Sequence, residues 1–411
     1  MATGIQQTPL FTRLELPLSD TCNLSCAFCY TCGGCGKAYD QEHVDASFGW
    51  FFKQLEAGKD RLKTPNISCS IYGGEPLVEY AHIKELVPKY RAVANSKGFK
   101  FKFSIVSNVT LLTEDKLEWL KANNVSVSCS IDGCPEAQDY FRKYKSGLGS
   151  SEQVYRAARL ILADGKGHSC RMTVAPETAP LMAESIRFVC EDLGFSMANM
   201  ILAGGVTWTD KDLAIIEEQS EKVTDWWIDN MRNGKHYSVY HLRNMLSKLW
   251  NPVRNTTLCS SGKTAVAVDT AGNLSPCHRF ANPSTDASYI LGNIRDGVTN
   301  LELWKKIRDF RITPYLTDKC LSCPAITACH ALCMHEMMLA KNGMFTPLPH
   351  YCKIWPVYWR QAVKAHNILM FENNSKYKAT YGSALLGATR CKSCGQPIRQ
   401  AKRSGGCSFN G

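Results

Sequence analysis

Short runs rich in β-branched and aromatic residues alternate with helical patterns over the first half of the chain. Six of these runs predict strands, at Arg13–Leu18, Ile67–Tyr72, Phe101–Ser107, Val125–Ile131, Cys170–Val174 and Asn199–Ala203. Stretches between them predict helices over His82–Ala94, Glu114–Ala122, Glu152–Ala163 and Ala183–Leu193. This alternation is typical of parallel βα units, whose functional loops follow the carboxyl ends of the strands. Six units predict an α/β fold with a partial (β/α)6 barrel.

The second half of the chain has a different pattern. Residues 210–250 are expected to be mainly helical, 259–352 are rich in cysteine, and a further helix is expected near 353–370 before a basic tail. We therefore divide the chain into a barrel over 1–210, a helical connector over 211–255, a cysteine-rich domain over 256–356, and a C-terminal helix with its tail over 357–411. No run of about 18 apolar residues and no secretory signal is present, so a cytoplasmic protein without a membrane span is expected.

Cysteine is the most unusual feature of the composition, with 20 residues in a chain of 411. Disulfides persist in oxidising compartments and are rare in a reducing cytosol, where clustered cysteines more often bind metal. The alternative, a secreted disulfide protein, finds no support without a secretory signal. The count therefore favours metal centres.

The net charge of +11 is concentrated near the C-terminus. Residues 360–411 contain nine Lys or Arg against one acid, Glu372, a balance of +8 that leaves +3 for the rest of the chain. Basic patches bind phosphate backbones, so a nucleic-acid partner for this tail is one hypothesis.

The first candidate for chemistry is a loop directly after the first predicted strand. It carries Cys22, Cys26 and Cys29 in C-x3-C-x2-C spacing. Three thiolates on one loop can ligate three irons of a [4Fe–4S] cube and leave the fourth iron open to a small molecule. A zinc knuckle is the alternative, but it would need a fourth protein ligand with its own spacing.

This loop and the elements after it resemble the radical S-adenosylmethionine (SAM) superfamily. In that family the open iron binds the amino and carboxylate groups of SAM, which is cleaved to a 5′-deoxyadenosyl radical. The run from Tyr72 to Pro76 resembles the GGEP element that contacts the SAM amino group, and glycine there lets backbone carbonyls approach the ligand. Ser107-Asn108 resembles the ribose-contacting pair, with Val109 in place of the usual glycine.

The resemblance implies further SAM contacts. The run from Ser130 to Gly133 resembles the S-x-D-G element, and Phe28 could stack near adenine. Arg142 and Arg171 are candidates for the SAM carboxylate because a guanidinium binds carboxylate through two parallel hydrogen bonds. The predicted SAM-binding residues are Phe28, Gly73, Gly74, Glu75, Pro76, Asn108, Ser130, Arg142 and Arg171.

Seven downstream cysteines resemble the SPASM pattern, in which two auxiliary [4Fe–4S] clusters are bound. The resemblance implies that one cluster, the outer, is bound by Cys320, Cys323, Cys329 and Cys352. It implies that the other, the inner, is bound by Cys259, Cys277 and Cys333. Residues 260–276 contain no further cysteine. The inner cluster is therefore expected either to have an open iron, to use a non-cysteine or substrate ligand, or to recruit a distant cysteine. With the first loop, three [4Fe–4S] clusters are expected.

SPASM proteins mostly modify peptides or proteins, so the resemblance implies a radical SAM oxidoreductase or maturase that acts on a peptide or protein. Anaerobic sulfatase maturases oxidise Cys or Ser to formylglycine, and others form thioether or carbon–carbon crosslinks. A low-potential electron donor such as flavodoxin or ferredoxin is an expected partner. One alternative is a modifier of a nucleic-acid-linked or small-molecule substrate. A non-catalytic electron-transfer protein is a third hypothesis, which the SAM elements argue against.

His278 is the candidate catalytic residue. In sulfatase maturases an acidic residue follows the cysteine of the G-x4-C element and is thought to act as a base. Here Pro276-Cys277-His278-Arg279-Phe280 occupies that place and more resembles thioether-forming maturases. Histidine can accept a proton near neutral pH. The alternative is a histidine that only satisfies hydrogen bonds near a cluster.

Ten cysteines lie outside these patterns. Cys69, Cys129, Cys170 and Cys190 occur in apolar runs and are expected to be buried as small hydrophobic residues. Two pairs, Cys32 with Cys35 and Cys391 with Cys394, could form a four-thiolate zinc site if the tail folds back onto the barrel. The alternative is a disordered tail with unrelated thiols.

Overall fold

The computed structural model describes residues 8–29, 39–250, 259–281, 285–329, 333–339 and 348–387. The chain forms two compact units, and it returns to each of them more than once. Unit 1 contains Met1–Met172, Thr257–Arg311 and Leu332–Thr346, and unit 2 contains Thr173–Thr256, Ile312–Ala331 and Pro347–Gly411. These units do not coincide with the four predicted segments, which stay a prediction about family modules.

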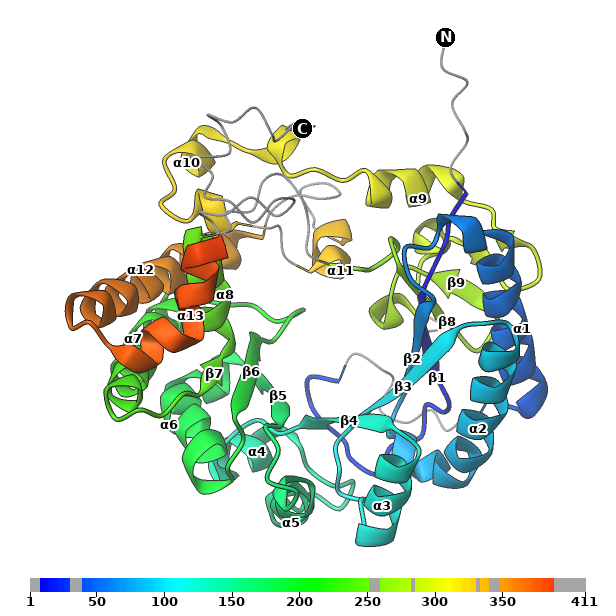
Figure 1. Cartoon of the computed structure of the whole chain (residues 1–411), viewed down its shortest axis with the longest axis horizontal. Helices are drawn as coiled ribbons and strands as arrows, with labels where there is room; N and C mark the ends of the chain where they lie inside the picture. The colour runs from blue at the N-terminus through cyan, green and yellow to red at the C-terminus, as the bar shows by residue number, and fades with distance from the viewer. Residues whose placement is uncertain are drawn as a thin grey trace. The chain divides into compact units, whose positions relative to one another are not determined.

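Unit 1 is organised by a mixed sheet whose strand order is β11-β10-β9-β8-β1-β2-β3-β4, with the first residues of β5 beside β4 (Figure 1). Strands β8, β1, β2, β3, β4 and β5 run parallel, whereas β9, β10 and β11 add antiparallel pairs. The strands are β1 (Arg13–Pro17), β2 (Asn66–Tyr72), β3 (Lys100–Ser107), β4 (Val125–Ser130), β5 (Ser169–Val174), β8 (Ala265–Val268), β9 (Asn273–Ser275), β10 (Gly292–Asn293) and β11 (Gly297–Val298). The predicted α/β class with its partial parallel barrel is confirmed.

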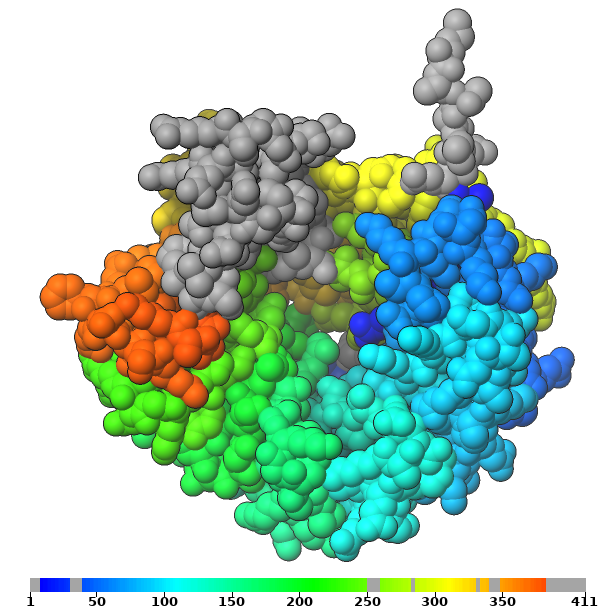
Figure 2. Space-filling model, viewed as in Figure 1, coloured from blue at the N-terminus to red at the C-terminus, as the bar shows by residue number. Residues whose placement is uncertain are grey.

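Helices cover one face of the parallel strands (Figure 1), and the same helices form the blue and cyan surface of Figure 2. Aromatic side chains of α1, among them Phe48 and Phe52, pack on Phe101 of β3. The helices of this unit are α1 (Gln41–Ala57), α2 (Tyr80–Ser96), α3 (Glu114–Ala122), α4 (Pro135–Phe141), α5 (Ser151–Leu162), α9 (Leu301–Arg308) and α11 (Met334–Met338). Helix α1 was not among the helices named from the sequence.

The opposite face of these strands is polar. Glu15, Ser70 and Ser104 lie in one row across β1, β2 and β3, and the hydroxyls of the two serines are 2.8 Å apart. Side chains alternate between the two faces of a strand, so the residues between these polar ones face the helices. Three cysteines predicted to be buried, Cys69, Cys129 and Cys170, are indeed at most 1% exposed. This row of Glu15, Ser70 and Ser104 gives the face opposite the helices polar groups that can contact a ligand.

Unit 2 contains the pair β6 (Met197–Leu202) and β7 (Ser238–Val239), and it is otherwise mainly helical. The fourth cysteine predicted to be buried, Cys190, is 1% exposed within the short π-helix that continues α6. The helices of unit 2 are α6 (Met182–Arg187), α7 (Asp210–Arg232), α8 (Tyr240–Trp250), α10 (Asp318–Leu321), α12 (Pro349–Phe371) and α13 (Ser375–Gly387). No helix in the described part of the chain is both long and apolar enough to cross a membrane.

Ion pairs join α7 and α12 and reduce the charge available near the C-terminus. Arg360 pairs with Glu217, and Lys364 pairs with Glu221 and Asp225. Two of the nine basic residues counted toward a nucleic-acid surface are therefore paired with acids on a neighbouring helix. Lys376 and Lys378 lie on α13. The other five, Arg390, Lys392, Arg399, Lys402 and Arg403, lie outside the described residues.

A buried histidine lies between α8 and α12 in unit 2. His241 is 1% exposed, and its ring stacks on Tyr358 with 4.7 Å between centroids. Neither ring nitrogen has a hydrogen-bond partner among the described residues. Burial lowers the pKa of His241 to about 3. The folded state therefore holds this imidazole neutral, because burial removes the water that would solvate a positive charge.

His241→Phe should make stability less dependent on pH. An unfolded histidine has a pKa of about 6.5, so its stabilising contribution is present above that value and is lost as the pH falls toward 3. Over that window the wild type should lose up to about 1.4 kcal/mol per pH unit more than the variant. Urea unfolding at pH 7.5, 6.5 and 5.5 measures the difference, with His82→Gln in unit 1 as the control. Parallel pH profiles for wild type and His241→Phe would contradict the assignment.

Candidate active site and cluster-binding residues

The loops at the carboxyl ends of β1 to β4 form the first candidate site. Since these strands are parallel neighbours, their ends meet at one edge of the sheet. The cysteine loop follows β1, the GGEP run follows β2, Asn108 follows β3 and Asp132 follows β4. The topology therefore brings together the elements that the sequence placed at strand ends.

The GGEP loop is clamped to the backbone that precedes Cys22. The amide of Gly74 donates to the Ser19 carbonyl at 2.8 Å, and the amide of Glu75 donates to the Thr21 carbonyl at 2.9 Å. A Cβ at Gly74 would lie 2.1 Å from the Thr21 oxygen, and Gly73 has a φ of +139° with a Cβ position 2.2 Å from the Ser19 oxygen. Glycine is needed here for contact between two backbone segments, in addition to any approach to a ligand.

Glu75 is a buried anchor between β2 and β3. Its carboxylate accepts hydrogen bonds from the Leu77 amide at 2.9 Å, the Ser107 hydroxyl at 2.7 Å and the Asn108 amide at 2.7 Å. Burial raises the pKa of Glu75, and these hydrogen bonds oppose that effect. The carboxylate thus fixes the loop carrying Asn108, whose side-chain amide lies 3.8 Å from Cys22 Sγ. Pro76, which is buried, begins the 3₁₀ turn that follows.

Val109 is the residue at which the sequence resemblance led us to expect glycine. Its φ is +57°, in the left-handed region that a β-branched residue rarely adopts. Glycine adopts this backbone conformation more readily than valine. The amide of Val109 donates to the Ser107 hydroxyl at 2.9 Å.

Cys22, Cys26 and Cys29 lie close enough to interact electrostatically. Burial raises the pKa of Cys22, and it raises the pKa of Cys26 to about 11, with the neighbouring thiolates adding to both effects. The loop is held by amides of Ser25 and Ala27, which donate to the carbonyls of Lys143 and Phe141 at 2.7 and 3.4 Å. A bound cation relieves such repulsion, because a coordinating thiol is deprotonated by the metal.

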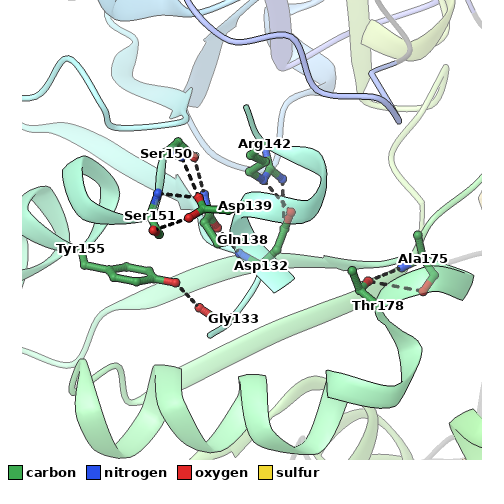
Figure 3. A network of polar contacts seen from close by, with 10 residues as sticks. All are labelled: Asp132, Gly133, Gln138, Asp139, Arg142, Ser150, Ser151, Tyr155, Ala175 and Thr178. Atoms are coloured by element: carbon green, nitrogen blue, oxygen red, sulfur yellow. Dashed lines mark hydrogen bonds and ion pairs between the residues drawn. The ribbon is translucent and has the colours of Figure 1, made fainter. Parts of the chain in front are cut away.

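The loop after β4 carries a buried ion pair, shown in Figure 3. Arg142 donates to Asp132 through Nε at 2.6 Å and through Nη2 at 3.1 Å. This edge of the guanidinium is therefore engaged by a protein carboxylate and not by the expected SAM carboxylate. Gln138 accepts from the Asp132 amide at 2.8 Å, and Tyr155 donates to the Gly133 carbonyl at 2.7 Å. The network fixes the end of β4.

Three further predicted SAM contacts lie beside these loops. Phe28 packs against Phe141 with 5.2 Å between ring centroids, and the Arg142 guanidinium lies 5.1 Å from the Phe28 ring. Ser130 and Arg171 are neighbours across β4 and β5. The positions are compatible with a ligand at this edge, and the individual contacts stay predictions.

The inner cysteine set comes together in unit 1. Burial raises the pKa of Cys259, and it raises the pKa of Cys277 to about 12; nearby Cys333 contributes to both effects. Strand β8 pairs with β1 and β9 returns alongside β8, so the residues after β9 reach the polar row of β1. The fold therefore explains how cysteines far apart in sequence meet beside the barrel.

His278 is held by Glu15 of β1. The Nδ1 atom of His278 lies 2.8 Å from Glu15 Oε2, and the His278 amide donates to the same oxygen at 2.9 Å. Burial alone would raise the pKa of Glu15, but the contacts with His278 lower it overall. The ring of His278 also lies edge-on to Tyr72, with 4.9 Å between centroids. Glu15 was missed from the sequence, although an acid within an otherwise apolar strand was its signal.

Arg279, the next residue, reaches the inner set from the same turn. Its Nη1 atom donates to Cys333 Sγ at 3.4 Å and to Glu336 Oε1 at 2.8 Å. Burial would lower the pKa of Arg279, but the charges of Cys333 and Glu336 raise it. Neither Arg279 nor Glu336 was predicted, because their proximity depends on α11 packing beside the turn.

The outer cysteine set lies in unit 2. Cys320 and Cys323 flank the end of α10, and Cys352 is in the first turn of α12. Burial raises the pKa of Cys352, and nearby Cys320 and Cys323 contribute. Cys329 lies in the same unit, directly after a 3₁₀ turn. All four predicted ligands are therefore in one compact unit.

The residues present fit iron–sulfur clusters in their chemistry. Each set supplies clustered thiols, and burial raises the pKa of at least one thiol in every set, a penalty that coordination to iron removes. The four cysteines of the predicted zinc site, Cys32, Cys35, Cys391 and Cys394, lie outside the described residues, so this site stays a prediction.

Two family profiles match the chain in the order that the sequence predicts. The profile of the radical SAM superfamily matches residues 16–189, and the SPASM profile, an iron–sulfur cluster-binding domain, matches residues 259–324. The second match ends before Cys329, Cys333 and Cys352. The first profile includes the cysteine loop at Cys22, and the second includes Cys259, Cys277, Cys320 and Cys323.

Characterised proteins are similar over most of the chain. The cysteine-type anaerobic sulfatase-maturating enzyme of Clostridium perfringens is 24% identical, over 86% of this chain and 96% of that protein. The serine-type enzyme of Bacteroides thetaiotaomicron is 25% identical, over 86% of this chain and 89% of that protein.

Known structures share the fold. Native anSMEcpe with bound AdoMet and the Cp18Cys peptide is 22% identical, covers 87% of this chain and 99% of its own, and has a TM-score of 0.67. Streptococcus suis SuiB bound to the precursor peptide SuiA is 17% identical, covers 83% and 76%, and has a TM-score of 0.54.

Gly74→Val should weaken SAM binding and also reduce occupancy of the cluster at Cys22, Cys26 and Cys29. The added side chain collides with the Thr21 backbone immediately before Cys22, so the loop must shift. Iron content should fall by up to about four atoms, the content of one cube. Iron analysis and equilibrium dialysis with SAM measure both effects. The control is Gly49→Ala, where no atom lies within 4 Å of the added Cβ. Unchanged iron content with Gly74→Val would show that the clamp is dispensable.

Proposed function

Since this chain is a radical SAM enzyme with a SPASM domain, related to anaerobic sulfatase-maturating enzymes at about 24% identity, we propose that it oxidises or crosslinks a side chain of a peptide or protein. When bound, SAM and the clusters would supply the 5′-deoxyadenosyl radical that removes a hydrogen atom, and an acceptor for the electron released by the substrate. The observation that carries the proposal is the contact between Glu15 of β1 and His278, the residue that directly follows Cys277.

The residues of this chain divide the work between two sites. Cys22, Cys26 and Cys29 would hold the SAM-binding cluster, and the loops anchored by Glu75 would shape the SAM site. Cys259, Cys277 and Cys333 would hold the inner auxiliary cluster. The polar row of β1 to β3 would line the substrate side, because its hydroxyls and charges turn away from the apolar helices.

His278 would accept the proton that the substrate loses. If Nδ1–H donates to Glu15, the lone pair of the imidazole is on Nε2, which is then the nitrogen able to take a proton. Glu15 also stabilises the imidazolium that results, as a carboxylate does behind a catalytic histidine. The imidazole would thus replace the acidic residue that follows this cysteine in sulfatase maturases.

Both modifications that the relatives suggest remove the same set of atoms and electrons from the substrate. Formation of a carbon–sulfur double bond on the way to formylglycine, or of a thioether between a carbon and a thiol, removes one hydrogen atom, one electron and one proton from the substrate. The proton comes from the thiol and goes to His278. Resemblance of the Pro276–Phe280 run to thioether-forming maturases favours a crosslink, and similarity to sulfatase-maturating enzymes favours formylglycine.

A low-potential donor of the flavodoxin or ferredoxin class would reduce the SAM-binding cluster. A short Cys-containing peptide or a sulfatase encoded beside this chain would identify the substrate class. Nucleotide- or DNA-modifying neighbours would instead favour the nucleic-acid hypothesis.

Reconstituted protein should contain about twelve iron atoms, as three [4Fe–4S] clusters require. Replacing Cys22, Cys26 and Cys29 together by Ala should remove about four and abolish SAM cleavage. Cys129→Ala is the control, because Cys129 is buried away from the predicted ligands and should leave the iron content unchanged. About four iron atoms in the wild type, with zinc at the remaining cysteines, would refute the three-cluster proposal.

His278→Ala should lose product while SAM cleavage continues without coupling to the substrate. Loss of a general base typically costs about 10²–10⁴-fold, and His278→Asp should recover part of that activity. Glu15→Gln should give an intermediate loss, and it should add little in the His278→Ala background because the two residues act as a pair. Product and 5′-deoxyadenosine are quantified together, with His82→Ala as the control. Wild-type product yield with His278→Ala would make the histidine structural.

A further inference from the structure

The inner cysteine set has a charged neighbour that neither the SAM chemistry nor the proton transfer uses. Arg279 donates from Nη1 to Cys333 Sγ at 3.4 Å, and from the same nitrogen to Glu336 Oε1 at 2.8 Å. The side chains of Arg279 and Glu336 are 21% and 9% exposed. A guanidinium thus lies between a predicted cluster ligand and a carboxylate, largely out of water.

Such a position acts on the electron affinity of a cluster. A hydrogen bond to a ligating sulfur and a nearby positive charge both favour the reduced state, which carries one more electron. The effect of a charge is larger where water is excluded, because the local dielectric constant is lower. A negative charge beyond the guanidinium has the opposite influence and weakens that of the arginine.

Glu336 is the carboxylate that holds Arg279 in place. It lies on α11, three residues after Cys333, so a single short segment carries both the cluster ligand and the acid. Its Oε2 atom is buried without a hydrogen-bond partner among the described residues. The negative charge of Glu336 is therefore compensated chiefly by the arginine that also touches the ligand sulfur.

We propose that Arg279 and Glu336 form a pair that sets the reduction potential of the inner auxiliary cluster, with Arg279 raising it and Glu336 limiting the rise. The pair would adjust how readily this cluster accepts the electron that leaves the substrate. That consequence rests on the proposed function, whereas the effect on the potential depends only on a cluster being bound at Cys259, Cys277 and Cys333.

The test is a potentiometric measurement on the reconstituted full chain, followed by electron paramagnetic resonance. Replacing Cys22, Cys26 and Cys29 by Ala removes the SAM-binding cluster from the spectrum. The inner-cluster signal is identified by its loss when Cys277 and Cys333 are also replaced. The outer-cluster signal, from cysteines in unit 2, serves as the internal reference in every sample.

Arg279→Gln should lower the midpoint potential of the inner cluster, because the positive charge is lost. Glu336→Gln should raise it, because the amide keeps an oxygen for Arg279 but removes the opposing charge. The double variant should return close to the wild-type value, and Arg279→Lys should lie between wild type and Arg279→Gln. The outer-cluster potential should not move in any of them.

Shifts of the same sign for Arg279→Gln and Glu336→Gln, or no shift in either, would overturn the proposal. If either variant fails to retain the cluster, Arg279→Lys decides: an unchanged potential in that variant counts against the hydrogen bond to Cys333, and a lowered one supports it. If His278→Ala has full activity while the potentials shift as expected, the proposed proton transfer fails and the role of Arg279 stands.

Discussion

The pairing of β8 with β1 is the constraint on which the rest of the candidate site depends. Strand β1 already pairs with β2 on its other edge, so β8 extends the barrel sheet and brings the second half of the chain to its first strand. Ala265 and Ala267 of β8 lie beside Arg13 and Glu15. The turn after β9 then places His278 on the Glu15 carboxylate. Without this one strand pair, the inner cysteine set would have no fixed relation to the barrel.

Much of the fold could be predicted because its signals are local. All six strands of the alternating region begin and end within two residues of the expected positions, and Glu114–Ala122 forms the helix expected there. Cysteine spacing likewise identified the loop at Cys22 without any knowledge of its surroundings. Such features depend on residues close together in sequence, so a single chain is sufficient to recognise them.

The contacts that shape the chemistry could not be predicted in the same way. Glu15 and His278 are 263 residues apart, and Arg279 meets Glu336 only after α11 has packed beside the turn. Arg142 illustrates the same limit: its guanidinium was expected to bind the SAM carboxylate, and nothing in the sequence indicated that its Nε and Nη2 atoms bind Asp132. Gly74 was recognised as necessary, but the backbone that requires it is the segment before Cys22. Which residue each of these side chains contacts is decided by the tertiary structure.

The distance in sequence between Glu15 and His278 has a consequence for synthesis of the protein on the ribosome. At about 5–20 residues per second, the partner of Glu15 emerges roughly tens of seconds after Glu15 itself. Throughout that interval β1 has an unpaired edge, and the carboxylate that will be buried must remain hydrated. The nascent barrel is therefore open on the side that later carries the inner cysteines, and a chaperone that shields exposed strand edges would find its target there until β8 arrives.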